Sequence, residues 1–388
     1  MIHHVPVFLY ICYVSIPCAM SDVSLKHKIA LGLIPRIGDI NARKLVSHIG
    51  SVEGVFSESY KSLMRIPGIG AGLAKYICDR SYLEKAEKEV DYVTRNNIKT
   101  YFYLDNDYPY RLRQCEDSPV VFFYKGNSDL NSSRILSVVG TRNATTRGRE
   151  VCDRIIGGLA LGYPDLITVS GLAYGIDIAA HKAALANNLQ TVGVLGHGFR
   201  TIYPSIHHST AQIMLIQGGL ITDFLSDELP ERNNFIKRNR IIAGISDATL
   251  VVESGIKGGA LITADIANSY NRDVFAVPGR PEDQWSSGCN NLIKRNKAAL
   301  VENSEDIEYY MNWKSEKKNV PVQQLLFGDM SDEEKLVYEK ISSEGEMNID
   351  SLSRAIGMPV YKLSPLLLQM EFNGILKCYP GNLYRAVN

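Results

Sequence analysis

The sequence has no excess of charge of either sign. Lys plus Arg and Asp plus Glu each number 42 among its 388 residues, so the formal net charge at pH 7 is zero. A protein that coats nucleic acid usually carries a broad positive field, so any anion site in this chain has to be local. Hydrophobic residues make up 45% and charged residues 22%, which is typical of a globular protein with a sizeable core.

Paired cysteines and nucleotide-binding motifs are also missing. The seven cysteines include no CxxC spacing, which argues against a disulfide framework or zinc site and indicates a reducing, cytoplasmic compartment. The phosphate-loop pattern GxxxxGK[ST] is absent, and Thr201 stands where a dinucleotide fingerprint built on Gly196 and Gly198 requires a third glycine. No Ser/His/Asp, Cys/His or metal-spaced cluster stands out. We therefore predict a protein with no catalytic residues, metal or cofactor.

The first twenty residues differ from the rest. Val5–Met20 is apolar, but no Lys or Arg precedes it and it contains two prolines. A secretion signal has a basic segment before its apolar core, and a membrane span needs about 20 mostly apolar residues. We expect residues 1–20 to be an extension or a misassigned start, and we expect no membrane partner.

A short repeat marks a helical domain over residues 21–97. Ile34–Gly38 reads IPRIG and Ile66–Gly70 reads IPGIG, and in each copy an alanine and an aliphatic residue follow at the same spacing. Glycine at a turn lets two short helices meet closely, so the repeat resembles a pair of helix-hairpin-helix units. Such turns can present N–H groups to a DNA phosphate or serve only to pack the domain, and the sequence leaves both open.

Between residues 98 and 302, short apolar runs alternate with helical segments. This alternation predicts a parallel sheet covered on both faces, and hence an α/β, Rossmann-like domain. The expected strands are Ile135–Val139, Leu166–Ser170, Thr191–Leu195, Leu220–Thr222, Thr249–Val252 and Val274–Val277.

The end of the chain predicts a third module. Residues 303–330 are charged and irregular and are expected to form a linker. Residues 331–388 have the order typical of a winged helix, with three helices before a hairpin that turns at Pro380–Gly381. The expected helices are Asp332–Ile341, Ile349–Ile356 and Val360–Phe372.

A winged helix can read DNA sequence, which would make the protein a regulator. The segment that would enter a groove, Val360–Phe372, has Lys362 as its only basic residue. Base reading and phosphate contacts both need cationic or amide side chains, so a protein-interaction role is the better interpretation.

The loops that follow the expected strands form the candidate site, because ligands of a parallel sheet collect where its strands end. Glycine lets an anion approach the backbone, N–H groups at a helix start carry partial positive charge, and arginine offers a bidentate fork. Together these features predict a site for the phosphates of a nucleic-acid chain. Its expected residues are Gly140, Thr141, Arg142, Ser170, Gly171, Gly196, Gly198, Lys237, Arg238, Arg240, Gly258 and Gly259.

Several of these residues also have a structural interpretation. Arg142 can form an ion pair with a neighbouring carboxylate, and Lys237–Arg240 can be a solvated helix face. Asp177 and His181 lie four apart, as an acid–base pair would. We expect instead that Asp177 caps its helix and that His181 packs through a hydrogen bond.

In these loops the chain resembles the DNA-processing protein A family, known as DprA or Smf. The resemblance begins near Tyr108 and extends to Ile293. The matching segments are VVGTR, SGLAYGIDIAAH, VLGHGF, RNRIIAGIS, GGALITA and VFAVPG.

The resemblance implies a protein without enzymatic activity that binds single-stranded DNA entering a bacterial cell during natural transformation. It further implies protection of that DNA, loading of the RecA recombinase, and a homodimer formed through the Rossmann-like domain. By the same resemblance, Arg142 would be the main phosphate contact, and Lys237, Arg238 and Arg240 would line the same pocket.

The alternative is an enzyme acting on nucleotides, of the phosphoribohydrolase type on a related fold. Such enzymes also have a Gly-Gly loop, and their PGGxGTxxE pattern places a glutamate after it. Here Gly258–Gly259 is followed by Ala260–Ala264 with no glutamate in register. The expected acid–base group of that reaction is therefore missing.

Overall fold

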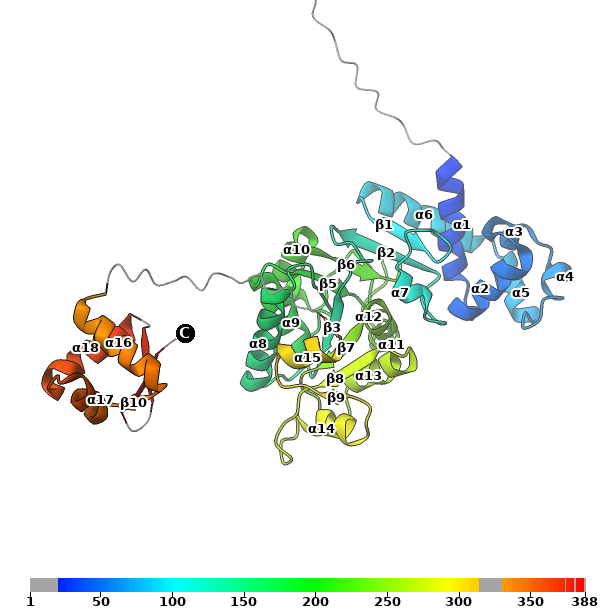
Figure 1. The fold of residues 1–388 in the computed structure, drawn as a ribbon. Coiled ribbons are helices and arrows are strands. Elements are labelled where there is room, and N and C mark those ends of the chain that lie inside the picture. Colours follow the sequence, from blue (N-terminus) through cyan, green and yellow to red (C-terminus); the bar gives the residue numbers. More distant parts are fainter. Residues whose placement is uncertain (1–19, 314–329, 374, 380–381, 387–388) are drawn as a thin grey trace, which may run out of the picture. The chain divides into compact units, whose positions relative to one another are not determined.

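A computed structural model describes residues 20–313, 330–373, 375–379 and 382–386. The contacts divide the chain into two units, residues 1–316 and 317–388, and each is described by itself (Figure 1). The predicted extension, residues 1–20, lies outside the described residues except for Met20, and so does the part of the predicted linker between 314 and 329.

Six helices form a helical region at the start of the first unit. Their shared core includes Ala42, Leu45, Ala74 and Ile77, the alanine and aliphatic positions of the two repeat copies, and all four are buried. The repeat therefore supplies the contact faces of two short helices. The six helices are α1 (Met20–Leu33), α2 (Gly38–Ile49), α3 (Val52–Ser57), α4 (Tyr60–Leu63), α5 (Ala71–Cys78) and α6 (Ser81–Arg95).

A nine-stranded, mostly parallel sheet follows, with the order β1-β2-β6-β5-β4-β3-β7-β8-β9. The six expected strands are all present as β3 to β8. Sequence patterning did not predict β1, β2 or β9, and β2 pairs antiparallel with both β1 and β6. The strands are β1 (Lys99–Phe102), β2 (Val121–Gly126), β3 (Ile135–Val139), β4 (Ile167–Ser170), β5 (Gln190–Val194), β6 (Gly218–Thr222), β7 (Ala248–Val251), β8 (Asp273–Ala276) and β9 (Ala299–Leu300).

Helices cover both faces of this sheet, as the apolar strands require. On β3, Ile135 and Val139 belong to the core beneath α12 and α13, whereas Leu136 and Val138 belong to the core beneath α8 and α9. A helix-covered α/β layer structure results (Figure 1). The helices are α7 (Tyr110–Arg113), α8 (Thr146–Gly162), α9 (Ile176–Ala186), α10 (His208–Ile216), α11 (Arg232–Lys237), α12 (Asn239–Ile245), α13 (Gly259–Ser269), α14 (Ser287–Lys294) and α15 (Ser304–Tyr310).

The strand order reverses between β3 and β7. From β3 the chain adds β4, β5 and β6 on one side, then returns to place β7 and β8 on the other. The loop after β3 leads to α8 on one face, and the loop after β7 leads to α13 on the opposite face. Loops that diverge in this way leave a crevice at the carboxyl edge of the sheet, where ligands of such folds bind.

The helical region is attached to the sheet through both apolar and polar contacts. Phe102, Val121 and Phe123 of β1 and β2 belong to the core of the helical region. The buried Glu89 of α6 accepts hydrogen bonds from the Ser226 backbone N–H at 3.0 Å and from its hydroxyl at 2.8 Å. Burial raises the pKa of Glu89, and the two bonds from Ser226 oppose this shift.

The expected linker begins later than its composition suggests. Residues 304–310 form α15, whose Ile307 is fully buried in the core shared with α8. Trp313 packs against Tyr163, the C-cap residue of α8, with 5.3 Å between the ring centroids. The chain up to Trp313 therefore belongs to the Rossmann-like domain. Three of the seven residues of α15 are acidic, which gives this short surface helix the composition of a linker.

The second unit contains the three expected helices and a small sheet of order β10-β12-β11. A capping box between Ser331 and Glu334 starts the first helix. Leu352, Leu363 and Leu367 are fully buried in the core of the unit. A winged-helix role for this unit stays a prediction. Its elements are α16 (Asp332–Glu344), β10 (Met347–Asn348), α17 (Ile349–Ile356), α18 (Val360–Phe372), β11 (Leu376–Tyr379) and β12 (Leu383–Ala386).

Candidate nucleic-acid interface

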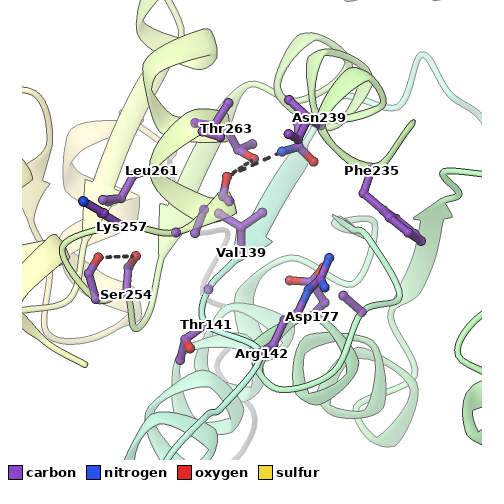
Figure 2. A pocket seen from close by; sticks show the side chains of 18 of the residues that line it. Val139, Thr141, Arg142, Asp177, Phe235, Asn239, Ser254, Lys257, Leu261 and Thr263 are labelled. Carbon is purple, nitrogen blue, oxygen red and sulfur yellow. Dashed lines mark hydrogen bonds between the residues drawn. The ribbon is translucent and has the colours of Figure 1, made fainter. Parts of the chain in front are cut away.

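A cavity of about 800 Å³ lies at the carboxyl edge of the sheet, where the strand order reverses. Figure 2 shows Val139 and Thr141 at its centre, Phe235 on one side, and Ser254 and Lys257 on the other. Of the expected site residues it is lined by Gly140, Thr141, Arg142, Arg238, Gly258 and Gly259.

The loop after β3 projects Arg142 beside the cavity. A Cβ on Gly140 would lie 2.4 Å from Cγ1 of Ile176, so only glycine allows the chain to turn this closely. The Thr141 N–H donates to the Glu253 carbonyl at 2.7 Å, which ties this loop to the end of β7. Arg142 itself is exposed, and its guanidinium lies 5.6 Å from the Phe235 ring centroid. Within the described parts of the chain it forms no ion pair or side-chain hydrogen bond.

The starts of α8 and α13 both lie at this edge of the sheet, and they differ in whether an anionic group already occupies them. At the start of α8 the Glu253 carboxylate accepts bonds from the Thr145 N–H at 2.9 Å and from the Thr145 hydroxyl at 2.5 Å. Gly148 lies against the same carboxylate, where a Cβ would come within 2.3 Å of Oε2. The positive end of α8 is therefore already neutralised.

The start of α13 is open to the cavity. Its N-cap is Gly258, which has no side chain to accept a bond from the first N–H groups. Lys257, Gly258 and Gly259 are all exposed and line the cavity. Uncapped N–H groups with partial positive charge, next to a lysine, have the chemistry that phosphate binding requires.

Three exposed cations line the same cavity as this position, namely Arg142, Arg232 and Lys257. No carboxylate in the described ranges pairs with any of them. Two acidic side chains also line the cavity, but both have cationic partners: Asp177 lies 3.8 Å from Arg238, and Asp265 lies 2.8 Å from Lys297. The cavity is thus locally positive in a chain with zero net charge.

Arg238 lies beneath the cavity and is only 3% exposed. Its guanidinium donates to the Val194 carbonyl and faces the Asp177 carboxylate, and Gly171 leaves the space that it fills. Burial lowers the pKa of Arg238 to about 10, against the opposing effect of Asp177, so it remains charged at neutral pH. Burial also raises the pKa of Asp177. Asp177 is not the helix cap that the sequence predicted, because Gly175 occupies the N-cap of α9.

The prediction that Lys237 and Arg240 line the cavity is wrong, because both lie outside it. Arg240 is buried and pairs with Asp223 at 2.5 Å and with Asp39 of α2 at 3.2 Å. Burial acts to lower the pKa of Arg240, but Asp223 and Asp39 outweigh it and raise the value. Lys237 is exposed and lies 3.6 Å from Asp223. Arg240 therefore joins the helical region to the sheet domain rather than facing the cavity.

Four other expected residues support the cavity without lining it. The buried Ser170 hydroxyl donates to the Val138 carbonyl at 2.6 Å. Gly171 packs on Arg238, Gly196 packs on Phe235, and Gly198 lies against the Leu225 carbonyl, with no space for a Cβ at any of the three positions. These glycines are explained by close packing and not by approach of an anion.

His181 packs through a hydrogen bond, as expected. It is fully buried, and its Nδ1 lies 2.7 Å from the hydroxyl of Thr191, which itself donates to the Thr168 carbonyl. The Thr191 oxygen can then only accept from the ring, which places the proton on Nδ1. Burial first, then Arg238 and His207, lower the pKa of His181 to about 3, so the ring is neutral at pH 7.

We expect His181 to make the protein less stable in mild acid. Its folded-state pKa lies below the unfolded value near 6.5, so its contribution is complete above pH 6.5 and is lost as the pH falls toward 3. The free energy of unfolding should decrease by about 1 kcal/mol per pH unit from this residue between pH 6 and pH 4. Urea titrations of the protein and of a His181→Asn variant measure this. An unchanged pH dependence in the variant would assign the effect to other groups.

Sequence reasoning missed four side chains that line the cavity, namely Arg232, Phe235, Lys257 and Trp285. Arg232 and Phe235 lie in a six-residue helix that has no clear apolar period, and Lys257 and Trp285 lie in loops. A signal was present for Lys257, because it directly precedes the Gly-Gly pair that opens a helix, and the start of a helix attracts anions.

The acidic and imidazole groups near this edge of the sheet are paired or buried. No group of three or more His, Cys, Asp or Glu residues suited to a metal ion occurs among the described residues. None of the helices in the described ranges is long and apolar enough to cross a membrane. The carboxylates of the cavity are held in ion pairs, and the nearby imidazole of His181 is buried.

Fold and cavity together define a class: a doubly wound, Rossmann-like α/β protein with a positively charged cavity at its topological switch point. Comparison with known proteins gives the family. The family model of DNA recombination-mediator protein A matches residues 99–312, and the chain belongs to this family of DNA-processing recombination mediators.

Similar proteins agree with this assignment. A Mycobacterium tuberculosis protein that carries the DprA name is 32% identical over 352 residues, which are 87% of this chain and 88% of that protein. The structure of DNA processing protein A from Streptococcus pneumoniae is 29% identical, with a TM-score of 0.61, and covers 73% of this chain and 97% of its own. DNA processing protein A from Helicobacter pylori, in a structure described as showing its single-stranded DNA binding mode, is 24% identical with a TM-score of 0.50. It covers 55% of this chain and 95% of its own and shares the fold.

Proposed function

We propose that the protein binds single-stranded DNA across the cavity. The observation that carries this proposal is the set of three exposed cations, Arg142, Arg232 and Lys257, which have no carboxylate partners among the described residues and line the same cavity as the uncapped start of α13. Gly140, Thr141, Gly258 and Gly259 let the sugar-phosphate chain approach the backbone. Arg238 supports the site from below through its charge.

A single strand suits this cavity better than a duplex. Phe235 lies at the wall with an arginine over its ring, and such a surface can hold an unpaired base by stacking. The bases of a duplex are stacked on each other and offer no free face. The binding mode described for the Helicobacter pylori protein, which has this fold, supports the same proposal.

The biological role follows from this binding and from the family. We propose that the protein acts in the cytoplasm as a homodimer, protects incoming single strands during natural transformation, and helps to load the RecA recombinase. On this proposal it catalyses no reaction. A phosphoribohydrolase activity gains no support from the site, since the residues after Gly259 supply no free carboxylate and Asp265 pairs with Lys297.

Titration of the full chain with a fluorescently labelled oligothymidine at several salt concentrations tests the proposal. Contacts of three cations with phosphates predict a slope of about −2 for each bound protein chain when the logarithm of the association constant is plotted against the logarithm of the salt concentration. Single strands release about 0.7 counterion per contact. A duplex of the same length should compete at least tenfold less well. Absent or salt-independent binding would contradict the proposal, and a nucleotide-hydrolysis assay would then be the next test.

A further inference from the structure

The cavity has a second aromatic side chain, on the wall away from Phe235. Trp285 lines it from the loop between β8 and α14 and is half-buried. The edge of its six-membered ring lies on Gly255, since a Cβ built there would be 3.7 Å from Cε3. Trp285 therefore belongs to the side of the cavity that also carries Ser254 and Lys257 in Figure 2.

The backbone that carries this indole is held firmly. The Asp283 carboxylate accepts the Trp285 N–H at 3.1 Å and the Ser286 hydroxyl at 2.6 Å. The Gly288 N–H donates to the Ser254 carbonyl at 2.8 Å, which fixes the start of α14 to the loop after β7. A ring on such a loop loses little freedom when a ligand contacts it.

The two aromatic walls stand several nucleotides apart. Phe235 packs on Gly196 after β5, whereas Trp285 packs on Gly255 after β7. Three strand spacings separate β5 from β7, or about 14 Å. A stacked strand advances about 3.4 Å per nucleotide. Arg142 and the start of α13 line the same cavity as the two rings.

We propose that Trp285 stacks against a base of the bound single strand and so marks a second base-binding position in the cavity. This inference rests on the proposed function. A phosphate held at Lys257 and the start of α13 places the base of the same or the next nucleotide at the Trp285 wall. Stacking of this kind depends weakly on base identity, because every base has a π-face.

Trp285 and Trp313 are the two tryptophans of the chain, which allows a direct optical test. Trp313 packs against Tyr163 and does not line the cavity. In a Trp313→Phe variant all tryptophan emission comes from Trp285, and saturating oligothymidine should quench it by at least a third. A Trp285→Phe variant, which reports Trp313 alone, should show almost no quenching.

Affinity gives the second measurement. Trp285→Ala should weaken oligothymidine binding at least fivefold, while Trp285→Phe retains most of the affinity. Neither change should affect binding of an abasic strand of equal length, which has the same phosphates but no bases. If oligothymidine binds tightly with no quenching and no loss in Trp285→Ala, the inference is wrong and the proposed function stands. If oligothymidine does not bind the protein at all, the proposed function itself fails.

Discussion

Replacing Arg142 by alanine is expected to weaken single-stranded DNA binding by about 10- to 100-fold while leaving the free energy of unfolding almost unchanged. A hydrogen bond to a charged group contributes about 1.5–3 kcal/mol, and each 1.4 kcal/mol is a factor of ten in affinity. Stability should not change, because Arg142 is exposed and its contact with the fold is the one with the Phe235 ring. Anisotropy of a labelled oligothymidine and a urea titration measure the two quantities.

The salt dependence makes this result specific. Losing one phosphate contact should reduce the slope of log K against log salt by about 0.7. Arg142→Lys keeps the charge and loses the bidentate fork, so it should retain the slope and show a smaller loss of affinity. Arg95→Ala is a matched control, because Arg95 is 79% exposed on α6 and away from the cavity. Equal losses in Arg95→Ala and Arg142→Ala would show that the effect is not local.

Arg240→Ala is expected to have the opposite profile and to lower the free energy of unfolding by about 3–5 kcal/mol. Removing one partner of a buried ion pair leaves the other charge without compensation. Asp223, whose side chain is only 3% exposed, would then keep only the distant Lys237, and Asp39 would lose its link to the sheet domain. Urea or thermal denaturation measures the loss.

Lys237→Ala provides the comparison for Arg240→Ala. Lys237 is 53% exposed and lies 3.6 Å from the same Asp223 carboxylate, so its removal should cost less than about 1 kcal/mol. DNA binding by Arg240→Ala, measured where the variant is still folded, should keep the salt slope of the unchanged protein. A stable Arg240→Ala variant with a reduced slope would instead make Arg240 a phosphate ligand.

The sequence was sufficient to place the parallel strands and the loops that form the cavity. The buried strands are short and apolar along their whole length. Glycines follow them at points where the chain packs closely or turns tightly. Gly140, Gly258 and Gly259 could thus be assigned to the cavity edge by their position after a strand. The antiparallel strands β1 and β2 were missed, because their aromatic residues serve two cores and show no simple period.

The direction of each basic side chain could not be obtained in the same way. Lys237, Arg238 and Arg240 are nearly adjacent at the junction of α11 and α12, but Arg238 contacts Asp177, whereas Lys237 and Arg240 both contact Asp223. Arg240 also contacts Asp39, which belongs to a different region of the chain about 200 residues earlier. Such ion-pair partners are determined by tertiary contacts and cannot be predicted from the neighbouring sequence. Arg142 was identifiable because a strand end fixes the direction of the loop that follows it.

Glu253 has a consequence for what the cavity can accept. Its carboxylate accepts hydrogen bonds at the start of α8. One of the two helix starts at this edge is therefore already occupied by an anionic group of the protein itself. On the proposed function, a polyanion is therefore expected to bind at the start of α13 and not at the start of α8. The Glu253 carboxylate thus leaves the start of α13, and not that of α8, for a phosphate. A strand bound with a phosphate at α13 would have the positions of its other phosphates along this edge fixed as well.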